Sequence, residues 1–519
     1  MKLILAVLAA FLVASCTSTQ PLSQAPNIIY ILADDLGYGD LSCLNKDSKI
    51  KTPYLDSMAK EGMYFTDAHS NSSVCTPTRY GVITGRYAWR SRLKKGVLGG
   101  ASNHLINPDR LTVAGLLQKQ GYHTAMIGKW HLGWDFTFKN SKASNGIGFN
   151  PKTQTIDYSK PVNFGPNANG FDYYYAHCGS LDMAPYVYVE NGKVTAAPNR
   201  VTENKDYKGF WRKGPTGSDF EHIDVLPNFI NRACKYIDER AQTKKPFFLY
   251  LPLPAPHTPI LPIDKFKGKS GTNEYGDFVQ QVDWHVHQVL ESLKKNGIKD
   301  NTIVIFTSDN GCSPRADFEE LTEIGHKPSH IYRGHKADIY EGGHRVPFIV
   351  HWPAKIKPGT VSNETICLTD LMATAADIND AEVPDNSAED SVSFLPALLG
   401  KGVKLREATV HHSINGSFAI RKDNWKLILC PGSGGWSSPR PKEAFGGDLP
   451  LIQLFDLAKD PAEQKNLYKQ NPAKVKELYT LLKKYVDEGR STDGKAQSNE
   501  GVTNINPKGF ETIAKELGL

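Results

Sequence analysis

The sequence predicts an α/β fold: a large, mostly parallel sheet sandwiched by helices, with a smaller C-terminal α+β subdomain. Two observations support this fold class. Nearly continuous apolar, β-branched runs alternate with longer helical stretches, as in a sheet whose two faces are both covered. Polar or glycine-rich residues follow each run at once, as expected where strands end in loops. The composition, with 40% hydrophobic and 22% charged residues among 519, supplies ample material for a large core.

The main part of the chain contains the alternating elements. The expected strands are Asn27 to Leu32, Thr124 to Ile127, Phe247 to Leu251, Thr302 to Phe306 and Val346 to Val350. The expected helices are Pro53 to Glu61, Thr112 to Gln120, Val225 to Ala241 and Tyr275 to Asn296. Ligands in open α/β sheets bind beyond the carboxyl ends of the strands, so polar residues at those ends are candidate site residues.

From about Lys401 the pattern changes to short strands, at Ser417 to Arg421, Trp425 to Leu429 and Gln453 to Asp456. A charged helix from Ala473 to Gly489 follows, and the tail after Ser491 is polar and weakly patterned. These features predict a small antiparallel sheet with one helix, packed on the main domain.

The first residues predict export. Lys2 precedes an apolar run from Leu3 to Val13, which is too short to span a bilayer and is typical of a secretory signal. The run ends in Val13-Ala14-Ser15-Cys16, which resembles the lipobox of bacterial lipoproteins. That resemblance implies lipidation of Cys16, a tether over residues 17–26, and a periplasmic or cell-envelope location in which the lipid anchor alone meets the membrane. The alternative is an ordinary signal peptide with a chance cysteine.

Charge and cysteine content limit the function classes. The formal net charge of +6 is mild for this length, and no Arg/Lys-rich block or nucleic-acid motif is present, so nucleic acid is not an expected partner. Apart from Cys16 and Cys75, the cysteines show no CxxC or regular spacing; they are Cys43, Cys178, Cys234, Cys312, Cys367 and Cys430. Export permits disulfides, but free buried thiols are equally compatible with this pattern.

Two acidic pairs follow strands directly. Asp34 and Asp35 end the run NIIYILADD, and Asp309 and Asn310 end the run TIVIFTSDN. Either pair alone could cap a helix. Two pairs at strand ends instead predict a shared site for a hard cation, because all the ligands are oxygens, which favours Ca²⁺ or Mg²⁺ over zinc.

The run Cys75-Thr76-Pro77-Thr78-Arg79, followed by Thr84-Gly85-Arg86, resembles the C-x-P-x-R signature of type I sulfatases. These enzymes belong to the alkaline-phosphatase-like superfamily. Further motifs match the family in order and spacing, from about Asn27 to Pro353 and loosely through Leu454 to Leu467. One position departs from the pattern, since the family most often has Ser or Ala where this chain has Thr78.

The resemblance implies a cofactor pair. In the family a formylglycine-generating maturation enzyme oxidises the motif cysteine, here Cys75, to formylglycine (3-oxoalanine), whose hydrate is a geminal diol that can accept and then release sulfate. The family also holds one Ca²⁺, which implies Asp34, Asp35, Asp309, Asn310 and the modified Cys75 as ligands. Arg79 would stabilise the charge of the nucleophile, and Asp309 would accept its proton.

The same resemblance implies roles for basic residues. Lys129 and His131 lie in GKWH, His257 ends the run LPLPAPH, and Lys336 precedes Glu341-Gly342-Gly343. Lys129 and Lys336 would hold sulfate oxygens, and His257 with Lys336 would protonate or stabilise the leaving alkoxide. His131 would take the proton whose loss eliminates sulfate.

The resemblance implies a sulfuric ester hydrolase with a catalytic domain over residues 27–400 and a C-terminal subdomain over 401–519. The aromatic and polar segment from Tyr173 to Asn191 could bind sugar, with His177, Ser180 and Asp182 as candidate contacts, or could be core. A sulfated carbohydrate is the expected substrate. The alternatives are a phosphomonoester or phosphodiester hydrolase of the same superfamily, and a catalytically silent, lipid-anchored glycan-binding protein.

Overall fold

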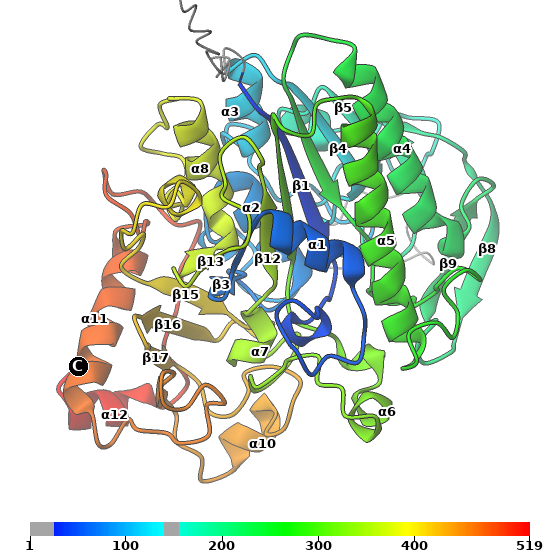
Figure 1. Cartoon of the computed structure of the whole chain (residues 1–519). Helices are drawn as coiled ribbons and strands as arrows, with labels where there is room; N and C mark the ends of the chain where they lie inside the picture. The colour runs from blue at the N-terminus through cyan, green and yellow to red at the C-terminus, as the bar shows by residue number, and fades with distance from the viewer. Residues whose placement is uncertain (1–24, 140–154) are drawn as a thin grey trace, which may run out of the picture.

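The computed structural model describes residues 25–139 and 155–519, so the signal segment and Cys16 lie outside the described residues. A ten-stranded mixed sheet forms the centre, in the order β13-β2-β12-β11-β1-β10-β4-β5-β6-β7 (Figure 1). In that order its strands are Thr360–Ser362, Met63–Phe65, Phe348–His351, Thr302–Ser308, Asn27–Ala33, Phe247–Pro252, His123–Lys129, Tyr173–His177, Tyr188–Glu190 and Lys193–Val194.

The five central strands, from β11 to β5, are mutually parallel, and their side chains alternate between two cores. Within β1, Ile28, Tyr30 and Leu32 belong to one core, and Ile29 and Ile31 belong to the other. Helices α2 (Cys75–Thr84), α3 (Val113–Lys119) and α8 (Leu371–Ile378) cover the first face. Helices α1 (Pro53–Glu61), α4 (Val225–Ala241) and α5 (Glu274–Lys295) cover the second (Figure 1). The predicted fold class is therefore confirmed.

The edges of the sheet differ from the sequence-based expectation. The strand expected at Val346 to Val350 is β12, Phe348–His351, and it runs antiparallel to β11. The chain also forms an antiparallel hairpin of β8 (Pro198–Asn204) and β9 (Trp211–Gly217), which no pattern predicted. Most residues of β8 are exposed or half-buried, so this hairpin lacks the continuous apolar signal that marks the central strands.

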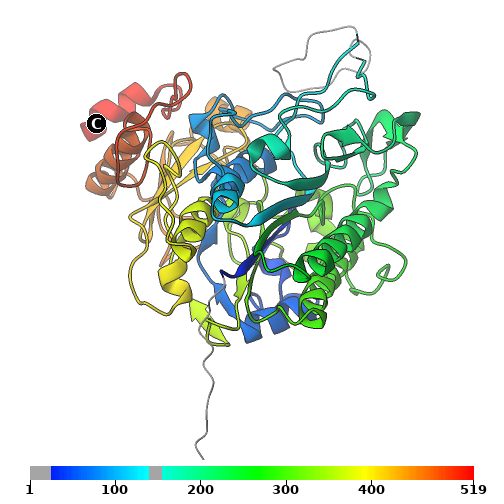
Figure 2. The same cartoon turned by 90° about the horizontal axis from the view of Figure 1, so that it is seen from above.

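The C-terminal sheet is antiparallel and contains β15 (Thr409–His412), β16 (Phe418–Lys422), β17 (Trp425–Ile428) and β18 (Gln453–Asp456). Helix α11 (Pro472–Asp487) packs on one face of this sheet. The structure adds α10 (Pro441–Gly446) and α12 (Phe510–Leu517), so the expectation of a single helix was wrong; α12 lies in the weakly patterned tail after Ser491. Figure 2 shows this part beside the main sheet, on the side away from α4 and α5.

The inner face of the C-terminal sheet carries charged as well as apolar side chains. Side chains alternate along each strand, so Phe418 and Ile420 face α11, and Arg421 points toward the main domain. Lys426 on β17 points the same way and contacts the short helix α7 (Glu341–His344). The two parts of the protein are thus joined through buried ionisable groups as well as apolar contacts.

The described cysteines are all free, and several are completely buried. Free thiols are thus the outcome among the alternatives that the sequence left open. Among residues 25–139 and 155–519, no helix has the length and apolarity needed to cross a bilayer.

Candidate active site

The order of the parallel strands brings the predicted site residues to one edge of the sheet. β1 lies between β11 and β10, and β4 lies beyond β10. Asp34 and Asp35 follow β1, Asp309 follows β11, His257 follows β10 by a short loop, and Lys129 ends β4. Because the strands are parallel, their carboxyl ends meet, and these side chains from distant parts of the chain become neighbours.

Cys75 is the first residue of α2, where the backbone N–H groups of the first turn lack helical partners and favour negative charge. Its sulfur and carboxylate oxygens of Asp34 and Asp309 lie within 4.8 Å of one another. The side chain of Thr78, the position that departs from the family pattern, is buried and donates a hydrogen bond of 2.9 Å to the carbonyl of Ser72. This hydrogen bond therefore fixes the loop before Cys75 relative to the first turn of α2.

Three buried cations bind the acidic groups. Arg79 donates from Nε and Nη2 to the same oxygen of Asp309, at 3.1 and 2.7 Å. The Nζ of Lys129 lies 2.6 Å from Asp34, and the Nζ of Lys336 lies 2.6 and 2.7 Å from the two oxygens of Asp35. Each charge-assisted contact is stronger than a neutral one, so the site is held in a single arrangement.

Two histidines complete the set. The Nε2 of His257 lies 3.6 Å from Asp35, on the side of Lys336. His131 is completely buried; its Nε2 bonds the carbonyl of Leu98 at 2.8 Å, and its Nδ1 has no hydrogen-bond partner among the described residues. Burial and Lys129 hold the pKa of His131 well below its usual value, so the ring is neutral and can accept a proton.

The oxygens of this site fit a hard cation. Oδ1 of Asp34 and Oδ1 of Asn310 are buried without hydrogen-bond partners among the described residues, although Oδ1 of Asp34 lies 3.4 Å from the Nη2 of Arg79. Such buried oxygens are costly unless a ligand satisfies them. Asp35 has an uncommon left-handed backbone with φ of 65°, which costs roughly 1 kcal/mol or more and is tolerated where a side chain must be aimed. The carboxylate and amide oxygens suit Ca²⁺ or Mg²⁺, and the Cys75 sulfur and a ring nitrogen of His257 also lie among the candidate ligand atoms.

The electrostatics differ between the two acids nearest Cys75. Burial alone would raise the pKa of Asp34, but Lys129, His257, Arg79 and Lys336 together hold it well below its usual value. Burial and the charge of Asp34 raise the pKa of Asp309 to about 7, against the opposing effect of Arg79. The neighbouring cations therefore favour the charged form of Asp34, whereas burial and the charge of Asp34 disfavour the charged form of Asp309.

The residues predicted to contact the substrate are bonded to other protein groups rather than to the groups around Cys75. His177 ends β5, is completely buried, and bonds the carbonyls of Ser180 and Val187, and burial lowers its pKa to about 4. The hydroxyl of Ser180 is buried, and the carboxylate of Asp182 pairs with Arg212. These contacts are with protein groups, and a role in substrate binding stays a prediction.

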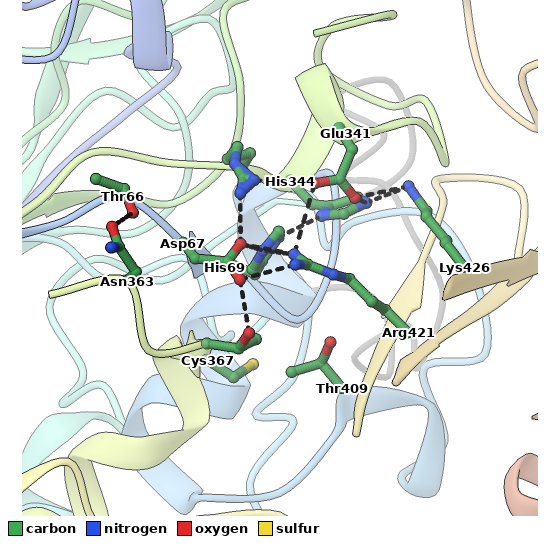
Figure 3. Close-up of polar contacts among 12 residues, drawn as sticks. Thr66, Asp67, His69, Glu341, His344, Asn363, Cys367, Thr409, Arg421 and Lys426 are labelled. Carbon is green, nitrogen blue, oxygen red and sulfur yellow. Dashed lines mark hydrogen bonds and ion pairs between the residues drawn. The ribbon is translucent and has the colours of Figure 1, made fainter. Parts of the chain in front are cut away.

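A second buried ionisable network was not predicted (Figure 3). Asp67, just before β3 (Ala68–His69), lies between Arg345 at 2.5 Å and Arg421 at 2.6 Å, and it also contacts His69 at 2.8 Å. Glu341 lies 3.0 Å from Lys426, which also contacts His344 and Glu463, each at 2.9 Å. No local signal reveals this network, because its members come from four distant segments.

Three histidines of this network, His69, His344 and His411, could in principle hold a metal ion. Their ring nitrogens already have protein partners: His69 and His344 bond each other and, respectively, Asp67 and Lys426, and His411 bonds Thr409 and the carbonyl of Ser70. With Arg421 and Lys426 also in contact, the cluster is an ion-paired core that links β3, α7 and the C-terminal sheet.

Comparison with known proteins identifies the family. The family model described as Sulfatase matches residues 26–381, and the model described as N-sulphoglucosamine sulphohydrolase, C-terminal, matches residues 334–433. The chain is similar to an N-acetylgalactosamine-6-O-sulfatase of Bacteroides thetaiotaomicron, with 36% identity over 89% of this chain and 93% of that protein. It is also similar to human steryl-sulfatase, with 31% identity over 89% and 87% of the two chains.

The fold comparison agrees. A solved structure from work on glycosaminoglycan metabolism by Bacteroides thetaiotaomicron matches with a TM-score of 0.77 and 35% identity, covering 89% of this chain and 99% of that one. The match spans both the main sheet and most of the C-terminal part. The chain therefore belongs to the sulfatase family, within the alkaline-phosphatase-like superfamily, and is a sulfuric ester hydrolase.

Proposed function

We propose that this protein hydrolyses sulfate monoesters of sulfated glycans, using a formylglycine made from Cys75 and one bound Ca²⁺. The observation that carries the proposal is the position of Cys75 at the start of α2, where its sulfur lies within 4.8 Å of carboxylate oxygens of Asp34 and Asp309. Buried Oδ1 atoms of Asp34 and Asn310, which lack hydrogen-bond partners among the described residues, belong to the same site. Asp34, Asp35, Asp309 and Asn310 would hold the cation, whose charge would polarise a sulfate oxygen.

The unmodified thiol is a poor nucleophile in this setting. Burial raises the pKa of Cys75, although Lys129 and Lys336 act in the opposite direction, so the thiolate fraction is small at neutral pH. Formylglycine supplies a hydroxyl nucleophile in the same place. Asp309 would accept the proton, and Arg79, whose Nη2 lies 2.7 Å from Asp309, would stabilise the charge that develops there.

The remaining groups would serve the sulfate and the leaving group. Lys129 and Lys336 offer Nζ donors that could bind sulfate oxygens while staying paired with Asp34 and Asp35. His257, on the side of Lys336, would donate a proton to the leaving alkoxide, and the unpartnered Nδ1 of His131 would accept the proton that triggers release of sulfate.

A glycan substrate is favoured by the relatives. The relative with 36% identity is named as an N-acetylgalactosamine-6-O-sulfatase, and its match spans nearly the full length of both chains. We therefore expect a sulfated amino sugar, free or within an oligosaccharide, as the substrate class.

The direct test is desulfation of a panel of defined sulfated oligosaccharides, with protein from a host that performs the cysteine modification. Matched phosphomonoesters and phosphodiesters test the alternative hydrolase activity of the superfamily. Release of sulfate with little release of phosphate is expected. Turnover of phosphate esters alone would refute the proposal, and turnover of neither class would favour a silent glycan-binding protein.

Removal of the cation should abolish turnover. Dialysis against a calcium chelator takes away the charge that offsets Asp34, Asp35 and Asp309, so we expect at least about a 100-fold loss of the rate. Re-addition of Ca²⁺ should restore it, and thermal unfolding measured at matched pH before and after chelation should show that the protein stays folded. An unchanged rate after verified removal of bound calcium would contradict the assignment.

The location of the protein is also a proposal. We expect export to the periplasm or cell envelope, with a lipid on Cys16 as the anchor. A Cys16→Ala variant should move from the membrane fraction to the soluble fraction, because one or more acyl chains supply the binding energy. Fractionation of the variant with the membranes, like wild type, would show that Cys16 is not the anchor.

A further inference from the structure

A cavity of about 500 Å³ has in its wall His335, the residue before Lys336. Its wall includes Tyr207 from the loop between β8 and β9, Arg315 from the loop after β11, His335, and Trp436 with Arg440 from the C-terminal part. The volume lies within the roughly 300–1,000 Å³ range of small-molecule sites. None of these residues belongs to the sulfate-binding groups described above.

Two contacts link the wall of the cavity to the chain segments that carry His257 and Lys336. His335 directly precedes Lys336, and its Nδ1 lies 2.9 Å from the carbonyl of Lys336. The loop that carries Tyr207 is tied to the segment after His257, because the N–H of Ile260 donates to the carbonyl of Lys208 at 2.9 Å. These links place the wall of the cavity on the same chain segments as the two groups proposed to serve the leaving oxygen.

The lining chemistry suits a sugar that carries an anion. Trp436 is 40% exposed and Tyr207 is 53% exposed, so both rings offer apolar faces to a ligand. The guanidinium of Arg315 lies 4.7 Å from the centroid of the Tyr207 ring, and Nε of Arg440 donates to the carbonyl of Trp436 at 2.9 Å. Arginine forks bind carboxylate and sulfate groups with two parallel hydrogen bonds.

The segment of the cavity wall at Trp436 and Ser437 is held by hydrogen bonds to Asp338. The backbone N–H groups of Trp436 and Ser437 donate to one carboxylate oxygen of Asp338 at 2.8 and 3.0 Å, and the Ser437 hydroxyl donates to the other at 2.6 Å. Asp338 is completely buried beneath this loop, so its carboxylate is engaged by the wall itself. The described lining residues include no carboxylate. Arg315 also donates from Nη1 to the carbonyl of Tyr207 at 3.0 Å. The Glu443 carboxylate accepts from the Ser438 hydroxyl and the Arg440 N–H at the edge of the cavity.

We propose that this cavity is a subsite for the glycan, in which Trp436 stacks on a sugar ring and Arg315 and Arg440 select substrates with a second anion. That anion is a carboxylate or a further sulfate, distinct from the sulfate that is removed. The proposal rests on the proposed function for the identity of the scissile group, and it adds a preference for polyanionic chains over singly sulfated ones.

The test compares matched disaccharides: one with a single sulfate, one with that sulfate and a uronate carboxylate, and one with two sulfates. R315Q and R440Q should each lower kcat/KM about 10- to 100-fold on a doubly charged disaccharide, mainly through KM, and less than about twofold on the singly sulfated one. The W436A variant should lower kcat/KM on all the disaccharides and spare a small aryl sulfate. The control K235Q removes an exposed positive charge on α4 and should change none of these values.

Equal losses on singly and doubly charged substrates, or no loss, would overturn the proposal. The two doubly charged probes show whether a carboxylate or a sulfate is the preferred anion. A titration separates this proposal from the proposed function, using disaccharides that lack the scissile sulfate and carry only the second anion. Weaker binding by R440Q than by wild type supports the subsite even if no sulfate ester is hydrolysed, and equal binding refutes it.

Discussion

Replacing Cys75 by alanine should reduce sulfatase activity by about 10⁴-fold or more while leaving the protein folded. The substitution removes one buried sulfur at the first residue of α2, where Asp34 and Asp309 converge. Lys129, Lys336 and the cation ligands remain, so binding of sulfate should survive although covalent catalysis is lost. The measurement is the initial rate of sulfate release, with circular dichroism and thermal unfolding as the checks on folding.

A matched cysteine variant isolates the effect. Cys234→Ala changes a half-buried thiol on α4, whose sulfur donates a weak hydrogen bond of 3.7 Å to the carbonyl of Gln288, and activity should stay at the wild-type level. Mass spectrometry of the Cys75 peptide from active enzyme gives the independent readout. An intact thiol in fully active protein, or an active Cys75→Ala variant, would each eliminate the formylglycine nucleophile.

Much of the fold and the candidate site could be predicted because their signals are local. The strands β1, β4, β10 and β11 are continuous apolar runs, and each ends in polar residues that the parallel arrangement brings together. The pairing of Lys129 with Asp34 follows from this arrangement, since two strand ends at the same edge face one site. Short motifs at strand ends are thus sufficient to predict which residues gather, although not their distances.

The remaining features depend on contacts between distant segments. Arg421 and Lys426 lie in a short, alternating β pattern that predicts strands correctly, but the pattern does not say what their polar face meets. The structure shows that this face meets Asp67 and Glu341, more than eighty residues earlier in the chain. The same limitation applies to the cavity at Trp436, which forms only when the C-terminal part packs against the loops beside Lys336.

The buried network should contribute strongly to the free energy of unfolding, and the substitution Asp67→Asn should lower that free energy. The variant keeps the shape of the side chain and removes the charge that lies between Arg345 and Arg421. Leaving buried charges without their partner costs about 3–5 kcal/mol, so the urea midpoint at pH 7 should fall markedly. Asp487→Asn removes an exposed partner of Lys483 on α11, and it should leave the midpoint unchanged.

The pH dependence of the stability difference distinguishes loss of the Asp67 charge from a change in packing, because only the charge titrates. Burial would raise the pKa of Asp67, but Arg345, Arg421 and His69 hold it well below its usual value. A carboxyl with a depressed folded-state pKa stabilises the fold above its unfolded pKa of about 3.9, and this contribution is lost as pH falls toward the folded value. The difference between wild type and Asp67→Asn should therefore be constant from neutral pH down to about pH 5, and shrink below about pH 4.

The position of Asp67 connects this stability to the active site. Asp67 precedes β3, and the loop after β3 leads through Ser70 and Ser72 to Cys75. Ser72 is held by the carbonyl of His412 in the C-terminal sheet, so the loop is fixed from the same side as the network. If Asp67→Asn unfolds at the wild-type urea concentration at pH 7, the network carries no net stability, and the C-terminal sheet must be held by its apolar contacts alone.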